Sequence, residues 1–85
     1  MTYVIVFKPA AEKELQKLPA YNAAKILDQI ATLKDNPRPL SSRKLIGKSD
    51  TWRLRVGDYR ILYEVEDKIK LVRIYRIRHR KDVYR

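Results

Sequence analysis

The sequence lacks several features that mark common classes of protein. Its 85 residues include no cysteine, which excludes a disulfide framework and a zinc site with cysteine ligands. The longest apolar run, Val4 to Phe7, is far too short for a membrane span or for the core of a signal peptide. We therefore expect one small, soluble domain over residues 1–85, in a reducing cytoplasm.

Groups that usually carry catalysis are scarce as well. The chain has one histidine, His79, and its carboxylates do not cluster at metal-ligand spacing. It has only two glycines, no Gly-rich phosphate loop, and no serine that stands out as a nucleophile. We therefore expect no metal and no cofactor.

Positive charge is abundant and unevenly distributed. The chain has 20 Lys and Arg residues against 10 Asp and Glu residues, a net charge of +10. Residues 1–40 carry a net +2, whereas residues 41–85 carry a net +8. A field concentrated in one half of a chain attracts a polyanion, so nucleic acid is the first candidate partner, followed by an acidic protein and an anionic membrane.

The N-terminal half predicts a short strand followed by two helices. Residues 2–7 are rich in β-formers, Pro9 suits the first turn of a helix, and Pro19 ends that helix. A second helix is predicted over residues 21–34, and its apolar face consists of Ala23, Ile26, Leu27, Ile30 and Leu33. The two helices form an αα-hairpin.

The C-terminal half predicts a β-meander. Strands are expected over residues 51–56, 59–66 and 69–78, with turns at Gly57-Asp58 and Asp67-Lys68, and residues 43–46 are a candidate for a shorter strand. The predicted fold is therefore α+β, in the order β-α-α-β-β-β, with an antiparallel sheet packed on two helices. The other face of the sheet is expected to be open and to carry arginines.

Several arginines are expected to lie close together on the open face of the sheet. The period of two places Arg53 and Arg55 on one face of a strand, and Arg60 joins them if the apolar side chains of its strand pack under the helices. The chain then ends in a basic segment that contains Arg78, His79, Arg80 and Tyr84, and these side chains are expected to converge on the same patch.

Guanidinium groups bind phosphate in a bidentate fork and stay ionised at any working pH. RNA supplies its own nucleophile, the 2′-OH, and arginines around the phosphorus would stabilise the charge that builds up during its attack. Tyr84 could stack on a base. The general base remains open among His79, a tyrosine and Glu64, and a surface salt bridge is the alternative role of Glu64.

The chain resembles the RelE/ParE toxin superfamily, on its RelE side, over nearly its whole length. The most specific motifs are Leu-Ile-Gly at residues 45–47, Trp-Arg-Leu-Arg-Val-Gly-Asp-Tyr-Arg-Ile-Leu-Tyr at residues 52–63, and Ile-Arg-His-Arg-Lys-Asp-Val-Tyr at residues 77–84. The resemblance implies a toxin of a type II toxin-antitoxin system, a ribosome-dependent mRNA endonuclease that cuts in the A site and is neutralised by a RelB-like antitoxin. An acidic antitoxin is expected from charge complementarity.

The resemblance also implies site residues. Family catalytic positions match Arg53, Arg55, Arg60 and Tyr84, and Arg78 and Arg80 compete for one further position, with Arg80 preferred because it follows His79. A histidine at this point is functional in only some branches of the family. Three alternatives remain open: a ParE-like inhibitor of DNA gyrase, a non-catalytic RNA-binding module and an inactive family member.

Overall fold

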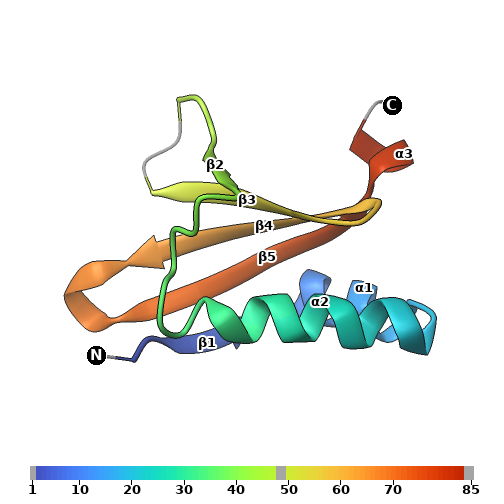
Figure 1. The fold of residues 1–85 in the computed structure, drawn as a ribbon, viewed down its shortest axis with the longest axis horizontal. Coiled ribbons are helices and arrows are strands. Elements are labelled where there is room, and N and C mark those ends of the chain that lie inside the picture. Colours follow the sequence, from blue (N-terminus) through green and yellow to red (C-terminus); the bar gives the residue numbers. More distant parts are fainter. Residues whose placement is uncertain (1, 48–49, 84–85) are drawn as a thin grey trace.

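The computed structural model describes residues 2–47 and 50–83 (Figure 1). In chain order its elements are β1 (Val4–Phe7), α1 (Pro9–Gln16), α2 (Ala20–Thr32), β2 (Ser42–Lys44), β3 (Thr51–Val56), β4 (Tyr59–Glu66), the 3-10 turn η1 (Asp67–Ile69), β5 (Leu71–His79) and α3 (Arg80–Val83). None of the described helices is long and apolar enough to cross a membrane.

The five strands form one sheet in the order β1-β5-β4-β3-β2. Strands β2 to β5 pair in antiparallel fashion, as expected for a meander, whereas β1 pairs with β5 in parallel. The predicted α+β class, the element order and the packing of the sheet on two helices are confirmed, and the shorter strand is present as β2. The parallel edge strand makes the sheet mixed.

The two long helices lie on one side of the sheet, and α3 lies on the opposite side (Figure 1). The core fills the space between the helices and the sheet. Its fully buried large side chains are Tyr63, Ile26, Leu33, Leu54, Ile61, Ile74, Val65 and Val72. All of the strand residues among them come from the alternating apolar positions of β3, β4 and β5, which leaves the intervening residues on the open face.

A few local expectations were wrong. Leu27 was expected in the buried face of α2, but its side chain is 43% exposed, because the apolar stripe of this helix is wider than the part that contacts the sheet. The last long strand begins at Leu71 and not at Ile69, because η1 continues through Ile69 and Lys70 adopts a left-handed backbone conformation with φ +53°. Ile69 is therefore exposed.

A β-bulge interrupts the pairing of β4 with β5. Leu62 lies opposite Arg76, but the next residue, Tyr63, lies opposite Ile74, so one residue of β5 has no partner. The bulge lets Ile74 and Ile77 both face the core although they are three residues apart. The extra residue therefore exchanges the faces of the sheet to which odd-numbered and even-numbered side chains of β5 point, for all residues after the bulge.

Candidate phosphate-binding face

Three arginines lie side by side across the open face of the sheet. Arg55 of β3 is the direct partner of Arg60 of β4, and Arg60 is the direct partner of Arg78 of β5. We call these three residues the arginine row. Neighbouring strands are about 4.8 Å apart, so the row spans about 10 Å.

The row takes its orientation from the core beneath it. Leu54 and Val56 on β3, Ile61 on β4 and Ile77 on β5 are all buried against the helices. Because successive side chains of a strand point to opposite faces, burial of these residues directs their neighbours in the row to the open face. The bulge is necessary for Arg78, since uninterrupted alternation from the buried Ile74 would turn Arg78 toward the core.

A hollow of about 200 Å³ lies beside the row, toward the edge strand β2. Its lining residues are Ser41, Arg43, Arg53, Arg55 and Arg60. Arg53 and Arg55 are exposed, and Arg60 and Arg78 are half-buried. A concave surface lined with four guanidinium groups is suited to a phosphate group, because each guanidinium can donate two parallel hydrogen bonds.

The acidic residues of the open face lie at the other end of the sheet, where they neutralise different arginines. Glu64 accepts a hydrogen bond from Arg73 at 2.8 Å, and Glu66 also pairs with Arg73. Glu64 also accepts a hydrogen bond from the Tyr75 hydroxyl at 3.2 Å, so it forms a salt bridge at a distance from the arginine row. Within residues 2–47 and 50–81, no acidic side chain forms an ion pair with Arg53, Arg55 or Arg78.

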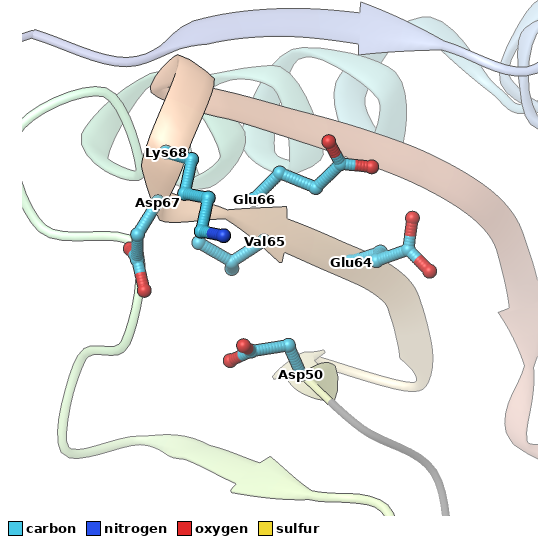
Figure 2. A pocket seen from close by; sticks show the side chains of 6 residues that line it. All are labelled: Asp50, Glu64, Val65, Glu66, Asp67 and Lys68. Atoms are coloured by element: carbon cyan, nitrogen blue, oxygen red, sulfur yellow. The ribbon is translucent and has the colours of Figure 1, made fainter.

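A second hollow, of about 530 Å³, marks this acidic end (Figure 2). Its lining residues are Asp50, Glu64, Val65, Glu66, Asp67 and Lys68. With four carboxylates against one lysine in its lining, it has the wrong sign for a polyanion. The open face is therefore divided into a basic end around the arginine row and an acidic end around this hollow.

Arg38 links the carboxylates of Asp50 and Asp67 at the acidic end. Arg38 donates hydrogen bonds to both carboxylate oxygens of Asp67, at 3.1 and 2.9 Å, and another to Asp50. The Tyr3 hydroxyl also donates to Asp67. These hydrogen bonds, from Arg38 first and Tyr3 second, lower the pKa of Asp67 to about 2.

Acid is therefore expected to destabilise the fold through Asp67. An unfolded aspartate has a pKa of about 3.9, so between roughly pH 4 and pH 2 the unfolded chain binds a proton that the folded chain does not, and stability falls as the pH falls. The variant Asp67→Asn should have a lower melting temperature than the wild type at pH 5 and a smaller further loss between pH 4 and pH 2. Circular dichroism melts measure both. Asp28→Asn, an exposed change on α2, is the matched control, and equal losses in all three proteins would contradict this role for Asp67.

The remaining residues of the predicted site do not all join the row. Arg80 begins α3, its backbone N–H donates to the Asp58 carbonyl at 2.7 Å, and its guanidinium lies 4.0 Å from the Asp58 carboxylate. Arg80 therefore lies at the β3–β4 turn, whereas Arg78 lies opposite Arg60. Tyr84 is outside the described residues.

His79 belongs to the other face of the sheet. Its strand partner is Tyr59, the two rings make a T-shaped contact with centroids 5.1 Å apart, and Tyr59 is itself opposite the buried Val56. The Nδ1 atom of His79 accepts a hydrogen bond from the Lys81 backbone N–H at 3.1 Å. The structure therefore does not bring His79 to the arginine row.

Glu14 of α1 binds the part of β5 that extends beyond its pairing with β1. Glu14 of α1 accepts hydrogen bonds from the Arg76 guanidinium and, at 2.8 Å, from the Ile77 backbone N–H. Burial raises the pKa of Glu14, but the hydrogen bonds from Arg76 and Ile77 outweigh it, so the net pKa lies below the usual value. Arg76 is thus ion-paired next to the row. The charge of Arg78 also lowers the pKa of Glu14, but among residues 2–47 and 50–81 Arg78 forms no ion pair, so its guanidinium can bind a ligand.

A small mixed sheet backed by a helical hairpin carries a face of closely spaced arginines, which is suited to binding a polyanion. The chain matches the ParE toxin family of type II toxin-antitoxin systems over residues 5–84, and it belongs to this RelE/ParE toxin superfamily.

Individual relatives agree with this assignment. The toxin RelG of Mycobacterium tuberculosis is 36% identical over 90 aligned positions, which cover 100% of this chain and 99% of RelG. The structure of the archaeal RelE–RelB complex from Pyrococcus horikoshii OT3 matches with a TM-score of 0.84 and 33% identity, over 94% of this chain and 97% of that chain. The toxin-antitoxin complex RelBE2 of M. tuberculosis matches with a TM-score of 0.81 and 28% identity, over 93% and 99%.

Proposed function

We propose that this toxin is a ribosome-dependent endoribonuclease that cleaves mRNA without a metal ion. The observation that carries the proposal is the arginine row, Arg55, Arg60 and Arg78, which lies beside Arg53. Among residues 2–47 and 50–81, Arg53, Arg55 and Arg78 form no ion pair with an acidic side chain. Like charges directly opposite each other in a sheet destabilise it. A bound polyanion removes this repulsion, so the row is better suited to phosphate than to water.

In the proposed reaction the 2′-oxygen of a ribose attacks the adjacent phosphorus. The bond between the 2′-oxygen and phosphorus forms as the bond from phosphorus to the 5′-oxygen breaks, leaving a 2′,3′-cyclic phosphate and a free 5′-hydroxyl. A proton leaves the 2′-OH and another reaches the 5′-oxygen. DNA has no 2′-OH and cannot react in this way.

The arginines stabilise negative charge on the phosphate and form no covalent bond with it. Negative charge grows on the phosphate oxygens as the fifth oxygen approaches, and guanidinium groups already in place stabilise that charge more than they stabilise the ground state. Arg60 is central because its strand partners on both sides are arginines. Arg53 and Arg55 bind the phosphate from the β3 side, Arg78 binds it from the β5 side, and Tyr84 stacks on a base.

The cognate antitoxin is the proposed regulator. The RelE chain of the P. horikoshii structure is in a complex with RelB, and a toxin with a net charge of +10 favours an acidic partner segment. Such a segment inhibits the toxin if it covers the arginine row or blocks entry to the ribosome.

Primer extension on a cellular mRNA, before and after the toxin is induced, tests the activity. New 5′ ends within the coding sequence are expected for the wild type and not for Arg60→Ala. The matched control is Arg73→Ala, because Arg73 also lies on the open face but pairs with Glu64 and Glu66 at the acidic end. Growth arrest without new ends, together with loss of supercoiling in a DNA gyrase assay, would replace this proposal with ParE-like gyrase inhibition.

A further inference from the structure

The arginine hollow extends beyond the row to the edge strand β2. There it is lined by Ser41 and Arg43, two residues that the reaction proposed above does not use. Arg43 is the direct strand partner of Arg53, so the two guanidinium groups share the open face. They form a second pair of arginines beside the row.

We propose that Arg43, with the Ser41 hydroxyl, binds a second RNA phosphate next to the one that is cleaved. This inference rests on the proposed endoribonuclease function, and it names Arg43 as a positioning residue for the RNA backbone. The phosphate bound here is not the one that reacts.

The spacing of the two arginine groups favours two phosphates over one. Residues two apart on a strand are about 7 Å from each other, so the Arg43–Arg53 pair lies about 7 Å along the strands from the row that contains Arg55. Arg43 can bind the second phosphate in bidentate fashion, while Arg53 contacts the cleaved phosphate together with the row. Two neighbouring backbone phosphates, bound together, would hold the RNA in one orientation across β2 and β3.

Arg43 is available for this role. It is exposed, and within residues 2–47 and 50–81 its one polar contact is a long hydrogen bond of 3.5 Å that it donates to the Leu40 carbonyl. Ser41 is exposed as well. A guanidinium without an acidic partner, placed opposite another guanidinium, has donors to spare for an anion.

Lys44 provides a matched control on the same strand. It is exposed and positively charged, as Arg43 is, but its strand partner is Trp52, so it belongs to the face of the sheet that Trp52, Leu54 and Val56 share. Alanine at either position removes one positive charge from β2. A difference between the two variants therefore reports on the open face and not on net charge.

The test measures RNA binding by fluorescence anisotropy. The probes are labelled 2′-O-methyl RNA oligonucleotides of two and six nucleotides, which lack the 2′-OH nucleophile, and the proteins are the full-length wild type, Arg43→Ala and Lys44→Ala. We expect Arg43→Ala to weaken binding of the six-nucleotide RNA roughly tenfold and to reduce the salt slope by about 1, with little effect on the dinucleotide. Lys44→Ala should match the wild type at both lengths.

Kinetics on programmed ribosomes provide a second readout. Arg43→Ala should raise KM and leave kcat unchanged, because a positioning contact made equally in the ground and transition states is a binding contact. Its melting temperature should not fall, since the change removes a repulsion with Arg53.

The outcomes separate this inference from the function on which it rests. A wild type that neither binds nor cleaves RNA would overturn both. A wild type that cleaves RNA, with equal affinities for Arg43→Ala and Lys44→Ala at both lengths, would overturn the second phosphate site alone.

Discussion

Replacing Arg78 with alanine is expected to slow mRNA cleavage by roughly 10²- to 10³-fold, the cost typical of removing one group that stabilises a developing oxyanion. Replacing Arg80 with alanine is expected to change the rate only a few-fold. The two residues are two positions apart in the sequence and carry the same charge, but Arg78 lies opposite Arg60 whereas Arg80 lies beside Asp58. Single-turnover cleavage on programmed ribosomes measures the chemical step in both variants.

The pair controls for long-range electrostatics, because each variant loses one positive charge from the same end of the chain. Arg78→Lys adds a further control, since lysine keeps the charge but cannot form the bidentate fork. It should recover only part of the rate. A larger loss of rate in Arg80→Ala than in Arg78→Ala would contradict the catalytic role of Arg78 in the row. The family's catalytic arginine would then be Arg80, which the family motif favoured.

The local parts of the fold were predictable from the sequence. Strand β3 (Thr51–Val56) and strand β4 (Tyr59–Glu66) have the predicted bounds, because a hairpin is specified by adjacent residues. Apolar and charged residues alternate cleanly in β3, and the Gly57-Asp58 turn separates the two strands. The same alternation was sufficient to place Arg53, Arg55 and Arg60 on one face.

The long-range parts were not predictable in the same way. The parallel pairing of β1 with β5 joins Val4 to Leu71, and no pattern within either segment specifies a partner so far along the chain. The segment at residues 2–7 indicated a strand but gave no direction for its pairing. The direction of β1 relative to β5 is determined only in the folded protein, where the αα-hairpin that follows β1 packs against the sheet.

The bulge in β5 could have been predicted from the spacing of the apolar residues in this strand. Val72 and Ile74 are two residues apart, but the next buried residue is Ile77, three residues further on. A spacing of three within a strand that otherwise has a period of two is typical of an inserted residue. Reading this break would have placed Arg78 on the open face with Arg60, and it would have favoured Arg78 over Arg80 for the site.

In the proposed reaction the substrate supplies the nucleophile and the toxin supplies the charges. Replacing the single ribose 2′-OH at the cleavage site with hydrogen is therefore expected to abolish cleavage at that linkage, because no other group in the proposed reaction attacks the phosphorus. Binding should change little, since the phosphates that the arginines contact are retained.

The most direct measurement uses purified, antitoxin-free toxin and ribosomes programmed with two mRNAs that differ only in this 2′ group. We expect the all-ribose mRNA to be cut to a product ending in a 2′,3′-cyclic phosphate, identified by mass spectrometry, and the 2′-deoxy mRNA to remain intact at that position. Cleavage of the 2′-deoxy mRNA at a comparable rate, or a product without the cyclic phosphate, would rule out attack by the 2′-OH.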